Sequence, residues 1–445
     1  MPQQVDQMIH AEWIVPVVPE NQLLTNHTLL VRGGKIVAIL PRQQAELEYQ
    51  ATQRFDLPGQ VLMPGLINAH THAAMSLLRG LADDLPLMTW LNEHIWPAEA
   101  KWINEAFIHD GSQLAIAEML LGGTTCFNDM YFFPNITGPA ADKAGIRAVL
   151  GLIAIDFPSA WASDGDEYLR KGLQLHDHFK TNTLIHTAFA PHAPYSVSDS
   201  VLSRIRVLAD ELEIPVHIHL HETHDEIIQG QQQHGNRPIQ RLQSLGLLSP
   251  SLAAVHMTHL EKDEIELFAS SGAHVVHCPE SNQKLASGFC PIVELINAGI
   301  NVAIGTDGAA SNNDLDMFSE MRSAALLAKG TARDASALPA AKALSMATIN
   351  GAKALGLQEY TGSLEIGKSA DIISVDLRRV QTQPVYHPIS QLVYAAGREQ
   401  VSHVWVAGRQ LVSNGALTTL DEETLIQRAS YWRDRISIEE KTPDS

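Results

Sequence analysis

The chain has 445 residues, of which 45% are hydrophobic and 18% charged, so it can bury a sizeable core and is not globally disordered. Asp and Glu total 50 against 31 Lys and Arg, and the net charge of −19 disfavours a DNA or RNA partner. The three cysteines form no CxxC pair, so we expect no disulfide scaffold. There is neither a secretory leader pattern nor a run of about 18 apolar residues, so we expect a cytoplasmic protein without a membrane partner.

Both ends of the chain have the pattern of short strands and turns. Near the N-terminus, apolar runs at 8–15, 28–32 and 35–40 surround a Gly33-Gly34 dipeptide, which is a hairpin signal. Similar runs return at 372–376, 401–406 and 409–412. We therefore expect one small β-sandwich built from both termini, residues 1–62 and 361–420, followed by a polar helix and tail over 421–445.

Between the two ends, strand-like and helical segments alternate. The expected helices include 106–121, 198–212 and 319–328, and the eight expected strands are 66–68, 124–128, 147–151, 183–188, 216–220, 253–256, 274–278 and 302–305. This pattern predicts an α/β fold, a (β/α)8 TIM-like barrel over residues 63–360. A doubly wound sheet is the alternative, but it does not explain why polar residues gather at the strand C-termini, where a barrel places its chemistry.

The first of these strands ends in Asn68-Ala69-His70-Thr71-His72. Side chains alternate along a strand, so His70 and His72 share a face, and imidazole pairs of this kind suit Zn²⁺ or Fe²⁺. A pair of hydrogen-bonded core histidines is the alternative interpretation.

Three later strands also end in groups that can bind a metal. The fifth carries His217, His219 and His221 before Glu222, the sixth ends at His256, and the eighth leads to Asp307. A buried Asp costs several kcal/mol unless it is paired or coordinates a metal. Convergence of such groups from four strands favours a metal site over simple packing.

Several longer motifs are similar to those of a known family. They occupy 62–72 (LMPGLINAHTH), 219–222 (HLHE), 305–312 (GTDGAASN), 350–356 (NGAKALG) and 362–371 (GSLEIGKSAD). In these motifs the chain resembles the amidohydrolase superfamily, in the branch of the methylthioadenosine/S-adenosylhomocysteine deaminases, guanine deaminases and triazine hydrolases. The resemblance runs over nearly the whole chain in the right order.

The resemblance implies one divalent metal ion, with Zn²⁺ expected and Fe²⁺ as the alternative. Its implied ligands are His70, His72, His219 and Asp307. The family places its third ligand three residues before the catalytic Glu, which favours His219 over His217 and His221, and we assign those two no function. Strand four, at 183–188, has no Lys that could bridge a second metal, which favours the mononuclear, deaminating members.

The resemblance also implies an activity, hydrolytic deamination of an adenine nucleoside by water. Its catalytic residues would be Glu222, His256 and Asp307, with Glu222 moving protons and His256 orienting the attacking water. The implied substrate contacts are Glu99 to the ribose, His192 to the purine, and Glu222, Asp307 and Ser311.

The sequence leaves the substrate within this class open. The segment 150–157 is apolar where relatives that accept S-adenosylhomocysteine often have arginines, which favours 5'-methylthioadenosine, with adenosine also possible. Met88, Trp90 and Trp161 are candidates for an apolar pocket. A guanine deaminase, a triazine hydrolase or chlorohydrolase, and a non-catalytic scaffold are the alternatives, and a homo-oligomer is expected by analogy alone.

Overall fold

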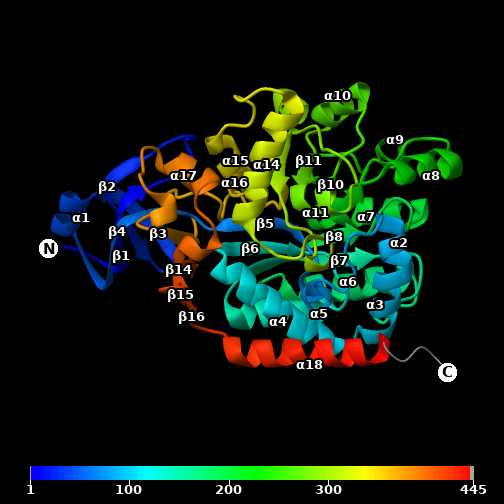
Figure 1. The fold of residues 1–445 in the computed structure, drawn as a ribbon, viewed down its shortest axis with the longest axis horizontal. Helices are drawn as coiled ribbons and strands as arrows, with labels where there is room; N and C mark the ends of the chain where they lie inside the picture. Colours follow the sequence, from blue (N-terminus) through cyan, green and yellow to red (C-terminus); the bar gives the residue numbers. More distant parts are fainter. Residues whose placement is uncertain (1, 441–445) are drawn as a thin grey trace.

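The computed structural model describes residues 2–440 and joins a parallel barrel to a second sheet made from both chain ends (Figure 1). Eight parallel strands follow one another in chain order around the barrel. They are β5 (Leu66–Thr71), β6 (Thr124–Asp129), β7 (Arg147–Ala154), β8 (Ile185–Pro191), β9 (Val216–Leu220), β10 (Leu252–His256), β11 (His274–His277) and β12 (Asn301–Ile304). The predicted fold class, a (β/α)8 barrel with a small β-sandwich built from both termini, is confirmed, and the β-rich part is one eight-stranded mixed sheet made from both ends of the chain.

Helices surround the barrel, so its strands are largely buried on both faces. Every residue of β7 is buried, for example. Apolar residues fill many strand positions, and buried polar residues interrupt them in β5, β6 and β9. The surrounding helices include α4 (Glu105–Leu121), α5 (Pro134–Ala144), α6 (Gly165–Phe179), α7 (Asp199–Leu212), α8 (His224–His234), α9 (Pro238–Ser244), α10 (Lys262–Ser271), α11 (Pro279–Lys284), α12 (Ile292–Asn297), α13 (Ala309–Asn312), α14 (Met317–Ala332), α15 (Ala340–Met346) and α16 (Ile349–Ala354).

A segment between β5 and α4 covers the mouth of the barrel. It contains η1 (Ala73–Leu78), α2 (Leu87–Thr89), η2 (Trp90–Ile95) and α3 (Trp96–Trp102). Helix α18 (Glu422–Glu440) lies along α4, and the indole N–H of Trp432 donates to Asp110 at 3.0 Å. The predicted C-terminal tail at 441–445 lies outside the described residues. Among the helices of residues 2–440, none combines the length and the apolar character that a membrane span requires.

The second sheet joins the two ends of the chain through one long central strand. In spatial order it contains β16 (Ala416–Leu417), β15 (Arg409–Ser413), β14 (Val401–Val406), β13 (Ile372–Asp376), β4 (Tyr49–Pro64), β1 (Gln3–Ile14), β2 (Leu24–Arg32) and β3 (Lys35–Pro41). Strand β4 pairs with the N-terminal β1 on one side and the C-terminal β13 on the other. The predicted Gly33-Gly34 turn joins β2 to β3, and both glycines have positive φ (59° and 73°). The remaining helices are α1 (Arg42–Glu48), η3 (Val380–Thr382), α17 (Pro388–Tyr394) and η4 (Arg398–Gln400).

The first and last barrel strands meet closely at the C-terminal end of the barrel. The Asn68 side-chain oxygen accepts from the Thr306 amide at 3.0 Å, and the Asp307 amide donates to the His70 carbonyl at 3.0 Å. A Cβ atom on Gly305 would lie 2.6 Å from the His70 amide nitrogen, so this approach requires glycine. The closure therefore brings the ends of β5 and β12 together.

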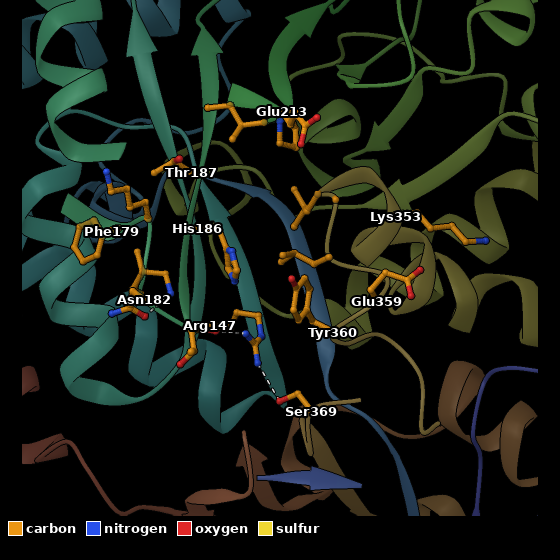
Figure 2. Close-up of a pocket in the computed structure, with 18 of the residues that line it drawn as sticks. Arg147, Phe179, Asn182, His186, Thr187, Glu213, Lys353, Glu359, Tyr360 and Ser369 are labelled. Carbon is orange, nitrogen blue, oxygen red and sulfur yellow. Dashed lines mark hydrogen bonds between the residues drawn. The ribbon is translucent and has the colours of Figure 1, made fainter. Parts of the chain in front are cut away.

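A buried ion pair connects the other end of the barrel to the terminal sheet. The Arg147 guanidinium donates to both oxygens of Asp371, at 2.9 and 3.3 Å, and to the Ser369 hydroxyl at 3.0 Å. Both charged side chains are almost fully buried. Arg147 borders a cavity of about 1190 Å³ whose walls also include His186 and Tyr360 (Figure 2). This cavity lies between the N-terminal strand ends and the terminal sheet.

We predict that Asp371→Ala destabilises the protein strongly. The change would leave the Arg147 guanidinium buried and without its counter-ion, which costs about 3–5 kcal/mol. Urea unfolding of the wild type and the variant measures this loss. The control is Asp210→Ala, which removes an exposed ion pair with Arg206 and should change stability by less than about 0.5 kcal/mol. Equal losses of stability in the two variants would contradict the conclusion that the buried Arg147–Asp371 ion pair stabilises the fold.

Candidate metal centre

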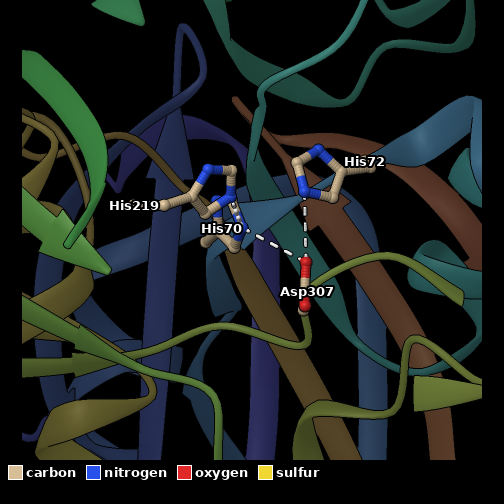
Figure 3. Close-up of side chains that lie close together, drawn as sticks. All are labelled: His70, His72, His219 and Asp307. Atoms are coloured by element: carbon tan, nitrogen blue, oxygen red, sulfur yellow. Dashed lines mark hydrogen bonds and ion pairs between the residues drawn. The ribbon is translucent and has the colours of Figure 1, made fainter. Parts of the chain in front are cut away.

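Four side chains from the ends of β5, β9 and β12 converge inside the barrel mouth (Figure 3). One ligand atom from each of His70, His72, His219 and Asp307 lies within 4.8 Å of the others. His70 Nε2 is 3.2 Å from His219 Nε2, and Asp307 Oδ1 is 3.3 Å from His70 Nε2 and 3.2 Å from His72 Nε2. The structure therefore brings together the four residues that the sequence singled out.

The hydrogen bonds of two of these histidines determine which ring nitrogen carries the proton. His72 Nδ1 lies 2.5 Å from the Met130 carbonyl, and His219 Nδ1 lies 2.8 Å from the His192 carbonyl. A carbonyl only accepts, so Nδ1 must be the protonated nitrogen of each neutral ring. Both Nε2 lone pairs then face the same point. Three imidazoles and a carboxylate are a ligand set for Zn²⁺ or Fe²⁺, so the residues fit a divalent cation.

Asp307 is oriented by its backbone and by two hydroxyl groups. It follows β12 with a φ of 62°, a left-handed conformation that is uncommon for a residue with a side chain. Its Oδ2 accepts from the Ser281 and Ser311 hydroxyls at 2.7 and 2.8 Å, which leaves Oδ1 facing His70 and His72. Burial opposes the charge of Asp307, but when His70 and His72 are protonated, their hydrogen bonds and charges outweigh it and hold the pKa of Asp307 well below the usual value. When the rings are neutral, a bound cation would supply that positive charge instead.

Glu222 lies directly beside this group, immediately beyond β9. Its backbone amide and that of His221 donate to the two carboxylate oxygens of Glu226, at 2.8 and 2.9 Å. Burial raises the pKa of Glu222 above its usual value. A carboxyl group whose pKa is raised toward neutrality suits proton transfer, and the position of Glu222 next to the four ligands allows it to serve a water there.

His256 points at the same region from the end of β10. Its Nε2 lies 3.8 Å from Glu222 Oε2, and its Nδ1 is 2.8 Å from the Asn282 side-chain oxygen. The φ of His256 is 74°, so this strand also ends in a left-handed residue that directs its side chain into the mouth. His256 is thereby held with one ring nitrogen available to a small molecule.

The remaining predicted site residues line one cavity above the four ligands. Glu99, on α3, accepts a hydrogen bond from the Tyr131 hydroxyl at 2.6 Å, and burial raises its pKa to about 7. His192, after β8, has its ring centroid 5.0 Å from that of His219. Ser311 lines the same cavity while its hydroxyl donates to Asp307.

One wall of the cavity is apolar. It combines the segment that covers the barrel mouth with the end of β7 and the loop beyond it. Its apolar lining includes Leu87, Trp90, Leu91, Ile95, Ile153, Ile155 and Phe157. Of the three residues expected in an apolar pocket, Trp90 lines this cavity, whereas Met88 and Trp161 are not among the lining residues. Among the described residues that line it, none is Lys or Arg.

Several groups that orient the site were not predicted from the sequence. Tyr131, Ser281 and Asn282 contact Glu99, Asp307 and His256, and their positions in loops and a short helix give no periodic signal. Glu226 did have a signal, because Thr223-x-x-Glu226 is the pattern of a helix N-terminus. Thr223 does cap α8, while the Glu226 carboxylate binds the two backbone amides before the cap. The His221 ring bonds the His259 carbonyl and the Ile239 amide, and its Nδ1 lies 3.8 Å from Glu264 Oε2, so these contacts give it a structural role.

Comparison with known proteins places this site in a family. The amidohydrolase family model matches residues 61–411. The chain is 54% identical to a 5-methylthioadenosine/S-adenosylhomocysteine deaminase from Teredinibacter turnerae, over 97% of this chain and 98% of that protein.

Two solved structures extend the comparison. A zinc-bound adenosine deaminase from Xanthomonas campestris has 52% identity and a TM-score of 0.97, covering 98% of this chain and 100% of that one. Zinc-bound atrazine chlorohydrolase from Arthrobacter aurescens has a TM-score of 0.90 at 24% identity, covering 96% and 99%, and this likeness shows the shared fold. The chain belongs to the amidohydrolase family, and within it to the 5-methylthioadenosine/S-adenosylhomocysteine deaminases.

Proposed function

We propose that the protein is a metal-dependent deaminase that converts an adenine nucleoside and water to the hypoxanthine product and ammonia. This proposal rests on three features that occur together at one cavity: a metal-ligand group, the buried Glu222 and a second carboxylate at Glu99. Full-length relatives named as deaminases of 5-methylthioadenosine and S-adenosylhomocysteine support it.

His70, His72, His219 and Asp307 would hold one divalent ion, which we propose to be zinc. The relative from Xanthomonas campestris contains zinc, and the ligand set is one that zinc accepts. When bound, such an ion supplies an activated water at neutral pH, because it lowers the pKa of bound water from about 15.7 to about 7.

Glu222 carries protons between the water and the adenine ring. The ring carbon that bears the amine becomes more electrophilic when the neighbouring N1 is protonated. Glu222 takes a proton from the attacking water, delivers it to N1 and then assists the departing ammonia. General acid–base catalysis of this kind contributes typically about 10²–10⁴-fold. The raised pKa of Glu222 favours a carboxyl group that both accepts and returns the proton.

His256 and Asp307 act on the attacking oxygen from the other side. His256, fixed through Asn282, orients the water and stabilises the negative charge that develops on the oxygen. Asp307 accepts the second proton of the water and passes it on to the departing amine, which leaves as ammonia. Two serine hydroxyls hold its Oδ2, so Oδ1 is the oxygen that faces the reaction.

The nucleoside is positioned by polar groups at the cavity rim and by the apolar wall. Glu99, oriented by the Tyr131 hydroxyl, accepts hydrogen bonds from the ribose 2'- and 3'-hydroxyls. His192 and Ser311 contact the purine. The wall formed by Trp90, Ile155 and Phe157 faces an uncharged 5'-substituent, and within residues 2–440 no Lys or Arg lines the cavity to pair with an amino-acid carboxylate. The predicted cytoplasmic location and homo-oligomer stay predictions.

We predict that the protein deaminates 5'-methylthioadenosine with a higher kcat/KM than S-adenosylhomocysteine. The carboxylate of the larger substrate would enter a region without a lining cation, where burying a charge costs free energy. An ultraviolet assay over these two nucleosides, adenosine, guanine and cytosine measures the preference. Conversion of guanine without conversion of any adenine nucleoside would refute the proposed substrate class and favour a guanine deaminase.

We predict that Glu99→Gln lowers kcat/KM for adenine nucleosides by about 10–100-fold, because a hydrogen bond to a charged group contributes about 1.5–3 kcal/mol. Turnover of free adenine, which lacks the ribose, is the internal control and should change little. Glu222→Gln should instead abolish turnover of both substrates. Equal losses for nucleoside and base in Glu99→Gln would remove Glu99 from ribose recognition.

A further inference from the structure

The Nδ1 atom of each ligand histidine points away from the shared site, and its hydrogen-bond partner differs among the three. His72 and His219 each use a backbone carbonyl. His70 instead places its Nδ1 2.8 Å from the Nε2 of another histidine, His217, which lies two residues before His219 on β9. Backbone acceptors survive any side-chain substitution, whereas the support of His70 depends on one side chain.

We propose that His217 is a positioning residue that orients His70 for the metal ion. This inference rests on the metal-dependent function proposed above. For His70 Nε2 to offer its lone pair to a cation, the ring proton must lie on Nδ1, and His217 Nε2 must then accept it. The bond fixes both the protonation site and the rotation of the His70 ring.

The surroundings of His217 argue against an ordinary packing role. Its side chain is 1% exposed, and among the described residues its own Nδ1 has no hydrogen-bond partner. With Nε2 accepting, Nδ1 carries the proton, and a buried N–H without a partner is costly. A small apolar residue would avoid that cost if packing were the only requirement. The bond to His70 is the one contact that an apolar side chain could not make.

The neighbouring strand leaves space for this ring. Ala253 of β10 is the register partner of His217, and it belongs to a buried cluster that also contains Ala69 and Ala303. The ring planes of His70 and His217 are 30° from parallel and their centroids are 5.0 Å apart, so the two rings meet edge to edge through the 2.8 Å contact between their nitrogens. The small neighbours leave His217 room for the position from which it reaches His70.

Metal affinity tests this role without relying on turnover. We expect His217→Phe, which keeps a ring but removes the acceptor, to weaken zinc binding about 10–100-fold in competition with a chromophoric chelator. His217→Gln retains a side-chain carbonyl acceptor and should recover most of the affinity. The absorption spectrum of cobalt-loaded protein should shift in His217→Phe and stay close to the wild type in His217→Gln.

The matched control is His186→Phe, which replaces a histidine of the neighbouring strand β8 that lines the cavity at the opposite end of the barrel. Its zinc affinity should equal that of the wild type.

If His217→Phe does not fold, the smaller His217→Leu replaces it. Unchanged affinity and cobalt spectrum in the variant without an acceptor would overturn the proposal, and so would a failure of His217→Gln to recover affinity. A wild type that binds zinc but deaminates no nucleoside would refute the proposed function and leave this test intact.

Discussion

The convergence of four electron-pair donors on one point is the constraint on which the rest of the site depends. His70, His72, His219 and Asp307 would not stay close without a cation unless the fold held each of them. The fold holds the histidines through hydrogen-bond acceptors at their Nδ1 atoms, and it holds Asp307 through two hydroxyls that donate to Oδ2. The centre is therefore preorganised by contacts that the ion itself does not make.

Barrel closure and chemistry use the same residues. The contact between β5 and β12 depends on Gly305, and it joins the His70 carbonyl to the Asp307 amide. Strand ends with positive φ then direct Asp307 and His256 inward, and local strain of this kind is typical of functional sites. At the far end of the barrel, the Arg147–Asp371 pair connects the strands to a sheet that contains strands from both ends of the chain.

The barrel and the four candidate metal ligands could be predicted from the sequence because both leave periodic or family-specific patterns. Buried parallel strands appear as apolar runs, and the ligands end those runs. The groups that orient the ligands leave weaker traces: His192 supports His219 through its backbone carbonyl, and Asn282 reaches His256 from another segment. His217 was visible, but only coordinates distinguish a histidine that contacts a ligand from one that packs. The central strand β4 was missed because its first half is polar and exposed.

X-ray absorption spectroscopy at the zinc edge of the purified protein tests the central claim most directly, since it reports both metal and ligands. We expect one zinc ion per chain, surrounded by nitrogen and oxygen atoms at about 2.0–2.2 Å. An imidazole signal should be present and should decrease in His219→Ala. Protein that holds no stoichiometric metal, or zinc bound by sulfur at about 2.3 Å, would contradict the account.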